Sequence, residues 1–292
     1  SFQPRIRRGA FFEACWDHGC RNFSVYNRTY ISSTFSNPTK EYWQVINHVS
    51  LWPVMGERQI EISGVDAANF VQYLTCRDMS SCAVNQCKYS LLLNTEGGIV
   101  CDPIILRLEK NKFWISTSDC DLELWIKGAH VNSGLNVNIH DANVSLLQIQ
   151  GPKSSALLTK MFGEQISQLK YYWLKKLKFE DIDLIISRTG WSGELGYEIY
   201  LSEFDKGTYI FNQILEAGKE FSISVGAVNQ ARRIESGILS WGVDMSQNEN
   251  PFQVGLGRLV ETETRDNFIG KKAIIKLSKL KQKKVLVGMK LN

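Results

Sequence analysis

The chain has 292 residues, of which 43% are hydrophobic, so it can bury a large core in one or two domains. Its formal net charge of +4 is due to the lysines of the C-terminal segment. Residues 271–292 carry eight lysines and no acid, whereas residues 1–270 carry 26 basic and 30 acidic side chains. The body is therefore not expected to bind nucleic acid. The lysine-rich end is interpreted as a solvated helix face and linker, with a basic patch for an anionic partner as the alternative.

The seven cysteines and four histidines are scattered, and no Cys-x-x-Cys pair occurs. This pattern predicts reduced thiols in a reducing compartment, and neither a zinc nor an iron–sulfur site. No apolar run approaches the length of a membrane-spanning helix, and the Arg-rich first residues do not resemble a signal peptide. We therefore expect a cytoplasmic protein with neither a membrane nor a nucleic-acid partner.

In chain order, residues 1–40 predict an arm over the body, because they carry Pro, Arg, Ser and Thr without long periodicity. Alternating apolar residues and helical spacing predict the regular elements that follow. Strands are expected at 59–62, 89–93, 99–107, 113–116 and 144–150, and a strand hairpin at 177–200. Helices are expected at 67–74, 121–129, 154–162, 203–220 and 228–239. Hairpins mixed with helices indicate an α+β fold rather than a doubly wound parallel sheet.

Residues 188–200 form the most informative motif, Arg-Thr-Gly-Trp-Ser-Gly-Glu-Leu-Gly-Tyr-Glu-Ile-Tyr. Its three glycines permit backbone turns that a side chain would forbid. The motif places an indole, a carboxylate and two phenols at the mouth of a loop. Such a group suits a flat, hydrogen-bonding heterocycle, because aromatic faces can pack on it and a carboxylate can accept two N–H donors. A glycine-rich turn with strand aromatics in the core is the other interpretation that the local sequence allows.

Residues 189–199 resemble the folate-binding signature of the glycine-cleavage T-protein family, the aminomethyltransferases. Four more segments resemble family motifs in the same order: Gly-Gly-Ile-Val-Cys-Asp at 97–102, Gln-Gly-Pro at 150–152, Arg-Ile-Glu-Ser-Gly at 233–237 and Asn-Phe-Ile-Gly-Lys at 267–271. The resemblance implies the family's folate-binding fold over 1–275, with mixed and antiparallel sheets and packed helices. It also implies that 276–292 are a linker and the first strand of a truncated C-terminal barrel domain.

Within that family the chain is most similar to the tetrahydrofolate-dependent dimethylsulfoniopropionate (DMSP) demethylases. The segments that carry this likeness include Pro-Arg-Ile-Arg-Arg at 4–8, His-Val-Ser-Leu-Trp at 48–52, Gln-Cys-Lys-Tyr at 86–89 and Asp-Pro-Ile-Ile-Leu-Arg-Leu-Glu at 102–109. T-proteins usually have Asp-Asp where this chain has Cys-Asp at 101–102, and Tyr-Thr where it has Trp-Ser at 191–192. In contrast, Gly-Glu at 193–194 is closer to the T-protein loop, so the exact substrate stays open.

The resemblance assigns three residues to tetrahydrofolate, the implied methyl-accepting co-substrate. Glu198 would hold the pterin ring through its carboxylate, and Tyr89 and Arg233 would be further folate-binding residues. A strand glutamate that faces solvent is the alternative for Glu198. For Arg233 the alternative is a structural ion pair with Glu235.

Four positions are assigned to the substrate and to the chemistry. Trp191, Ser116 and Tyr200 would line the substrate end of the pocket, and Asp102 and Tyr200 would be catalytic. Asp102 lies in an apolar strand, where a carboxylate needs a partner or a task. Trp191 and Tyr200 could instead be plain core aromatics.

A sulfonium substrate is consistent with these aromatic residues. The methyl of DMSP is already activated, so no general acid is needed, and each cation–π contact is worth roughly 0.5–2 kcal/mol. Catalysis would then be mostly alignment of that methyl with nitrogen 5 of tetrahydrofolate. The resemblance implies a methyltransferase that yields methylmercaptopropionate and 5-methyltetrahydrofolate, and it leaves a homodimer open.

Two other functions stay open. An aminomethyltransferase of glycine cleavage would need a carboxylate to assist deamination and a docking surface for its lipoyl carrier protein. An idle folate-binding module of iron–sulfur assembly would carry the signature Lys-Gly-Cys-Tyr-Thr-Gly-Gln-Glu, which this chain lacks.

Overall fold

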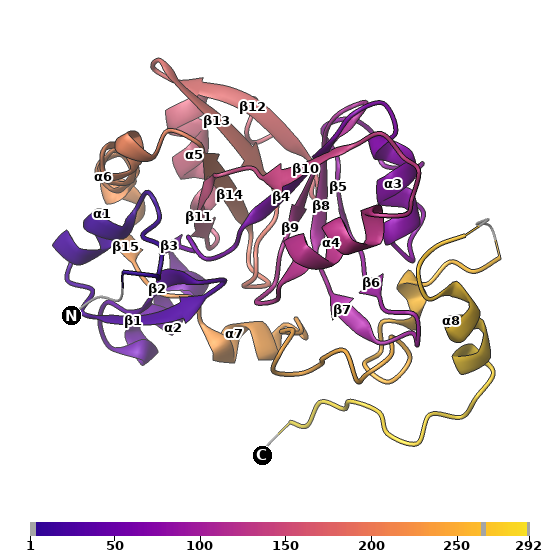
Figure 1. The fold of residues 1–292 in the computed structure, drawn as a ribbon. Coiled ribbons are helices and arrows are strands. Elements are labelled where there is room, and N and C mark those ends of the chain that lie inside the picture. The colour runs from indigo at the N-terminus through magenta and orange to yellow at the C-terminus, as the bar shows by residue number, and fades with distance from the viewer. Residues whose placement is uncertain (1–3, 264–266, 291–292) are drawn as a thin grey trace. The chain divides into compact units, whose positions relative to one another are not determined.

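The computed structural model describes residues 4–263 and 267–290, which divide into two compact units (Figure 1). The first unit comprises residues 1–58 and 143–238, and the second comprises residues 59–142 and 239–292. The first contains α1 (Phe12–Asp17), β1 (Asn22–Tyr26), β2 (Thr29–Thr34), α2 (Pro38–Asn47), β3 (Val49–Pro53), β11 (Ser145–Gln150), α5 (Ser154–Phe162), β12 (Leu174–Phe179), β13 (Ile182–Ser187), β14 (Gly196–Leu201), α6 (Gly207–Gly218), β15 (Ile223–Val225) and α7 (Gln230–Glu235). The second contains β4 (Gln59–Ser63), α3 (Ala67–Leu74), β5 (Cys87–Tyr89), β6 (Leu92–Leu93), β7 (Ile99–Cys101), β8 (Ile104–Glu109), β9 (Lys112–Ser116), α4 (Leu122–His130), β10 (Asn138–Asp141) and α8 (Lys271–Ser278).

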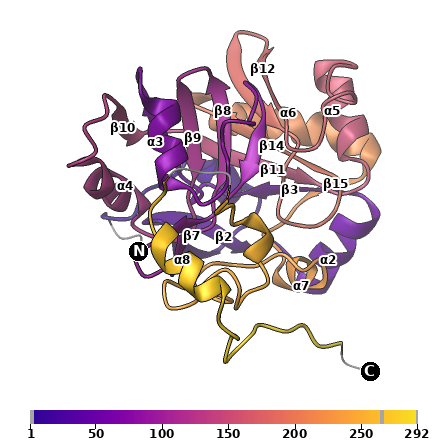
Figure 2. The same ribbon diagram turned by 90° about the vertical axis from the view of Figure 1, so that its right-hand side faces the viewer.

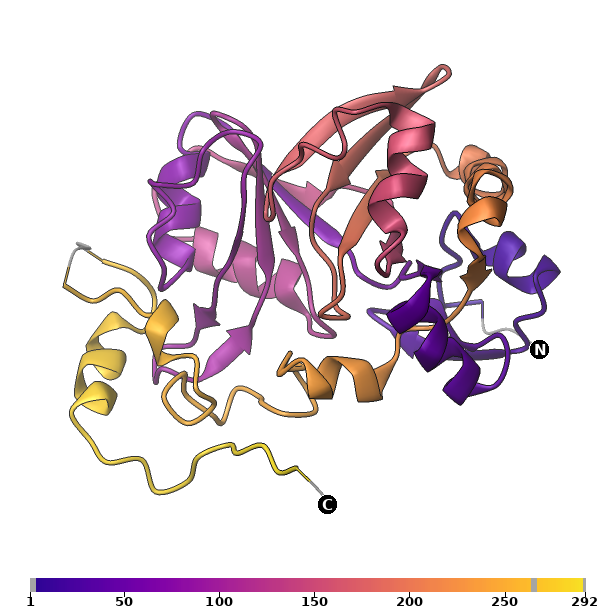
Figure 3. The same ribbon diagram turned by 180° about the vertical axis from the view of Figure 1, so that it is seen from behind.

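The first unit is built on a six-stranded sheet of order β12-β13-β14-β11-β3-β15. Its neighbouring strands pair antiparallel, except for β15, which pairs parallel with β3. Side chains alternate between the two faces of a strand, so Tyr197, Ile199 and Leu201 of β14 point to one face. They join Leu147 and Ile149 of β11 in a core that also takes apolar residues from α1, α5 and α6. Figure 3 shows α5 lying along this sheet.

The opposite face of the same sheet is polar but buried. Glu198 of β14 lies directly across from Gln148 of β11, which in turn lies across from Trp52 of β3. Ser50 and Gln150 form the next pair along the strands, and all five of these residues are at most 3% exposed. Buried polar groups need hydrogen-bond partners, and a polar ligand bound at this face could supply them.

The second unit has a five-stranded sheet of order β10-β4-β9-β8-β5 and a two-stranded sheet of β6 and β7. Phe70 and Leu74 of α3 and Ile126 of α4 pack with Ile115 of β9 in one core. A second core surrounds β6 and β7 and includes Ile274 of α8, a helix that Figure 2 shows beside the end of β7.

The α+β fold class is confirmed, and several predicted elements agree closely with the structure. The predicted helices at 67–74 and 154–162 coincide with α3 and α5, and the predicted strands at 59–62 and 113–116 lie within β4 and β9. The predicted helices at 203–220 and 228–239 are shorter in the structure, where α6 and α7 occupy their middle parts.

Three predictions of local structure were wrong. The segment predicted as an arm at 1–40 has regular structure in its described part, where it forms α1, a β1–β2 hairpin and the start of α2. The strand predicted at 99–107 is divided at Pro103 into β7 and β8, which belong to different sheets; proline has no N–H to donate to a ladder. The strand predicted at 89–93 is likewise divided into β5 and β6.

The division into 1–275 and 276–292 stays a prediction about the family's domains. It differs from the two compact units, since the second unit combines residues 59–142 with residues 239–292. The lysine-rich segment contains α8, as its interpretation as a helix face requires, and residues 279–290 form no strand within the described ranges.

Candidate functional site

Glu198 is the centre of the polar face of the first unit. Its Oε1 accepts a hydrogen bond from Gln148 Nε2 at 2.7 Å, and its Oε2 accepts one from the Tyr200 hydroxyl at 3.0 Å. The Thr189 hydroxyl donates to the same Oε2. Glu198 is 3% exposed, so the prediction's alternative of a solvent-facing strand residue is wrong.

Burial raises the pKa of the Glu198 carboxyl above its usual value, against the hydrogen bonds from Thr189, Tyr200, Gln148 and Ser187, which lower it. A carboxylate removed from water favours its neutral form, and donors to its oxygens favour the charged form. Gln148, Thr189 and Tyr200 donate directly to the carboxylate, and the Ser187 hydroxyl is bonded to the Thr189 hydroxyl, so this group stabilises a charged acceptor in a buried position.

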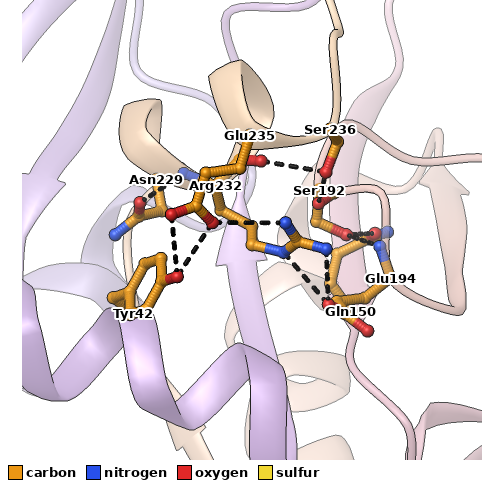
Figure 4. A network of polar contacts seen from close by, with 8 residues as sticks. All are labelled: Tyr42, Gln150, Ser192, Glu194, Asn229, Arg232, Glu235 and Ser236. Carbon is orange, nitrogen blue, oxygen red and sulfur yellow. Dashed lines mark hydrogen bonds and ion pairs between the residues drawn. The ribbon is translucent and has the colours of Figure 1, made fainter. Parts of the chain in front are cut away.

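The loop between β13 and β14 carries Trp191 and is held against α7 (Figure 4). The Ser236 hydroxyl donates to the backbone carbonyl of Ser192 at 3.1 Å, and the Ser192 hydroxyl donates to Gln150 Oε1 at 2.6 Å. Gly193 has φ +74°, and a Cβ there would lie 2.0 Å from Ser236 Oγ. Only glycine combines this backbone conformation with so close an approach of the loop to the helix.

An ion-pair network reinforces the same contact (Figure 4). Arg232 of α7 donates from Nε to Glu194 Oε1 at 3.0 Å, and its Nη2 lies 2.8 Å from the same oxygen. Arg232 Nη1 also lies 3.3 Å from Glu235, whose two carboxylate oxygens accept from the Tyr42 hydroxyl at 3.0 and 2.8 Å. We call the group of Tyr42, Glu194, Arg232 and Glu235 the loop clasp.

The contacts of the loop clasp show that the ion pair considered between Arg233 and Glu235 is wrong. Glu235, considered as the ion-pair partner of Arg233, pairs with Arg232 instead. Arg233 is 3% exposed, donates to Gln230 Oε1 and to the Ile238 carbonyl, and has its guanidinium carbon 5.4 Å from the centre of the Trp191 ring.

Neither Trp191 nor Tyr200 behaves as a plain core aromatic. Trp191 is only partly buried and lies beside Arg233, and Tyr200 is 2% exposed but directs its hydroxyl to Glu198. The core aromatic of the motif is Tyr197, which packs on the apolar face.

In the second unit, Asp102 is held between two hydroxyl groups. Its Oδ1 accepts from the Ser118 hydroxyl at 2.6 Å, and its Oδ2 accepts from the Tyr89 hydroxyl at 3.0 Å. Burial raises the pKa of Asp102 to about 6 in spite of these two bonds, and the nearby charge of Asp244 adds to the rise. Such a carboxyl exchanges a proton close to neutral pH, as a general base or acid must.

The neighbour of Asp102 carries no charge. Cys101 is fully buried, and burial together with the adjacent Cys120 thiol raises its pKa well above the usual range. Asp102 is therefore the single carboxyl group at positions 101–102, where T-proteins usually have two.

The structure thus places the seven predicted site residues in two groups. Glu198, Tyr200, Trp191 and Arg233 lie in the first unit, and Asp102, Tyr89 and Ser116 lie in the second. Ser116 is 4% exposed and accepts a hydrogen bond from Gln59 Nε2 at 2.9 Å. The binding of one ligand by both groups stays a prediction.

Sequence reasoning missed three residues that hold the carboxylates: Gln148, Thr189 and Ser118. Gln148 shares strand 144–150 with two other polar residues, Ser145 and Gln150, so the sequence alone does not single it out. Among the described residues, no three His, Cys, Asp or Glu side chains gather as a metal site requires, and no helix is long and apolar enough to cross a membrane.

We expect the ion pair of the loop clasp to stabilise the protein more than an exposed pair does. The Arg232 and Glu194 side chains are 18% and 21% exposed, so water screens them poorly. A double-mutant cycle with Arg232→Gln and Glu194→Gln should give a coupling energy of about 1–2 kcal/mol in urea unfolding. The exposed pair of Arg8 and Glu13 is the matched control and should give at most about 0.5 kcal/mol; equal couplings would contradict the clasp.

The raised pKa of Asp102 predicts a pH-dependent change in stability. The folded carboxyl, with a pKa of about 6, binds its proton more tightly than the unfolded one at 3.8, so Asp102 lowers the free energy of unfolding as pH rises through that window. Relative to Asp102→Asn, the wild type should therefore lose about 1–3 kcal/mol between pH 4 and pH 7.

Asp78 is the control, because its pKa is shifted in the opposite direction to that of Asp102. Burial would raise its pKa, but hydrogen bonds from Ser80 and Gln72 and the charge of Lys88 lower it to about 2. Asp78→Asn should lower the free energy of unfolding at pH 7. Urea titrations at both pH values check both variants, and a pH-independent difference for Asp102→Asn would refute the assignment.

Comparison with known proteins identifies the family. A model of the GCVT N-terminal domain matches residues 8–264. The dimethylsulfoniopropionate demethylase DmdA of Ruegeria pomeroyi is 32% identical over 275 residues, which cover 94% of this chain and 75% of that protein. An aminomethyltransferase of Caldanaerobacter subterraneus subsp. tengcongensis is 30% identical over 263 residues, covering 88% and 70% of the two chains.

The fold agrees with a solved structure. The crystal structure of glycine cleavage system aminomethyltransferase T from Bartonella henselae superposes with a TM-score of 0.82, at 22% identity, over 94% of this chain and 75% of that one. The matched domain covers most of the chain, and the sequence likeness extends to both groups of candidate residues. The chain therefore belongs to the GCVT family, the folate-dependent aminomethyltransferases and their relatives.

Proposed function

We propose that the protein transfers one methyl group from DMSP to tetrahydrofolate, giving methylmercaptopropionate and 5-methyltetrahydrofolate. The observation that carries this choice of donor is the neutral thiol of Cys101 beside Asp102. An amine that leaves from an aminomethyl group must gain a proton, whereas a sulfonium leaves as a neutral thioether. The 32% identity to DmdA over 94% of the chain supports the same choice.

Tetrahydrofolate is the co-substrate of the GCVT family, and we propose that the polar face of the first unit binds its pterin ring. The aminopyrimidine edge of a pterin presents N–H donors. Glu198 offers a buried carboxylate to them, and the neighbouring Gln148 Oε1 is a buried acceptor that has no partner within the described residues. A donor edge would remove the cost of leaving that acceptor unpaired.

Arg233, which remains a proposed folate-binding residue, would also affect the orientation of the methyl donor. Its guanidinium is 5.4 Å from the Trp191 ring, so a second cation on that side of the indole would be repelled. DMSP carries a sulfonium at one end and a carboxylate at the other. We infer that the carboxylate end points toward Arg233, and that the sulfonium contacts the face of Trp191 opposite Arg233 or another aromatic ring.

The second group of residues would act on the proton that nitrogen 5 loses when its bond to carbon forms. The sulfur keeps the electron pair of the bond that breaks. Asp102, with a pKa of about 6, would accept the proton, and Tyr89 and Ser118 would hold its carboxylate in place. Ser116 remains a proposed substrate contact.

The second candidate is an aminomethyltransferase of the glycine cleavage system. It is favoured by Glu194, which occurs in the T-protein form of the loop and is the residue that Arg232 binds. An aminomethyltransferase at 30% identity also supports it. We also propose a cytoplasmic protein, with a homodimer as one arrangement. With DMSP as the donor both substrates are small molecules, whereas an aminomethyl donor would be carried by a lipoyl protein.

The two donors can be distinguished directly. Purified protein with tetrahydrofolate should form methylmercaptopropionate and 5-methyltetrahydrofolate in equal amounts from DMSP, as measured by chromatography with mass detection. Aminomethylated lipoyl carrier protein should give no methylenetetrahydrofolate. The reverse pattern would move the assignment to glycine cleavage.

Glu198→Gln should weaken tetrahydrofolate binding roughly ten- to a hundredfold, because a charge-assisted hydrogen bond in a dry site is worth roughly 1.5–3 kcal/mol. Titration calorimetry measures the affinity, and thermal melts check that the variant is folded. Glu216→Gln on α6, whose side chain is 66% exposed, is the matched control and should bind like the wild type. Equal affinities for all three proteins would place the pterin site elsewhere.

A further inference from the structure

Unpaired polar atoms gather on the polar face of the first unit. Ser50 Oγ, Trp52 Nε1 and Gln148 Oε1 are buried and make no hydrogen bond within the described residues. All three belong to β3 and β11, in adjacent register positions on the face that carries Glu198. Native proteins pair nearly all such atoms, so this face is incomplete without something bound to it.

The Glu198 carboxylate cannot by itself satisfy the whole donor edge of a pterin. A carboxylate has about four acceptor sites. Two hydroxyl groups occupy Oε2, from Thr189 and Tyr200, and the Gln148 amide occupies one site of Oε1. The remaining capacity is on Oε1, and it is too small for two parallel donors.

Gln148 can supply the second acceptor. Its Nε2 donates to Glu198 Oε1 at 2.7 Å. The oxygen of the same planar amide group is therefore not used in this bond. The two residues are direct cross-strand neighbours, so the sheet fixes their spacing. Gln148 is 2% exposed, and its Oε1 is a buried acceptor that makes no hydrogen bond within the described residues.

We propose that Gln148 is a ligand-binding and specificity-determining residue: its Oε1 accepts an N–H of the 2-amino group, and the Oε1 of Glu198 accepts the adjacent N–H of the aminopyrimidine edge. Its amide also positions Glu198 by donating to it. The inference rests on the proposed folate function and deepens it, because it assigns recognition of the 2-amino group to a pair of residues on adjacent strands.

Gln150 is a natural control on the same strand. It is also fully buried and faces the same side, but both ends of its amide are bonded within the protein. Nε2 donates to the Thr189 and Tyr197 carbonyls at 3.4 and 3.5 Å, and Oε1 accepts from Ser192 at 2.6 Å. Its replacement should weaken the loop without removing a contact to the ligand.

The test is a cycle between protein and ligand. Binding of tetrahydrofolate and of its 2-desamino analogue is measured by calorimetry for the wild type, Gln148→Leu and Gln150→Leu. The wild type should lose about tenfold in affinity when the amino group is removed, since one hydrogen bond to a buried acceptor is at stake. For Gln148→Leu the loss should shrink to about twofold or less, and for Gln150→Leu it should stay near the wild-type ratio.

Four other outcomes of this experiment can be told apart. A Gln148→Leu ratio equal to that of the wild type would overturn the proposal, as would a wild type that binds both ligands equally, a result that needs no variant. If Gln148→Leu fails to fold in thermal melts, the unbranched Gln148→Met takes its place in the same cycle. A wild type that binds neither ligand would refute the proposed function itself.

Discussion

The buried carboxylate of Glu198 is the constraint on which the candidate site depends. Burial opposes its charge, so the fold surrounds it with donors from three directions: Gln148 on β11, Tyr200 on its own strand and Thr189 from the loop that follows β13. Each donor is held by backbone pairing or by the loop, not by solvent. An apolar face covered by α1, α5 and α6 gives the sheet its stability and leaves the other face for polar groups.

The loop after β13 connects this acceptor to the proposed methyl donor. Thr189 binds Glu198, Trp191 lies two residues further along, and Glu194 fastens the loop to Arg232 of α7. Arg233, next to Arg232 in the helix, lies over the Trp191 ring. Helix α7 therefore holds the loop through Arg232 and places the positive charge of Arg233 beside Trp191. A change in the loop clasp would therefore reach both Thr189, which binds Glu198, and Trp191.

Sequence patterns predicted the parts of the structure that local chemistry controls. The helices α3 and α5 have clear apolar spacing, and the motif residues Glu198 and Asp102 were found through their family resemblance. Strand β3 was missed because its alternation covers only Val49, Ser50 and Leu51 before Trp52 and Pro53 end it. Strand β10 was missed because its residues are polar and half-exposed. Gln148 and Ser118 acquire their roles from cross-strand register and loop placement, which depend on contacts between distant residues and have no local signature.

The most direct test of this account is a crystal structure of the protein with tetrahydrofolate. The account predicts the pterin ring on the polar face of the sheet of β11 and β14, with its donor edge within hydrogen-bonding distance of Glu198 Oε1 and Gln148 Oε1. Thr189 and Tyr200 should keep their bonds to Glu198 Oε2. A pterin bound elsewhere, with the polar face filled by water, would contradict the central claim.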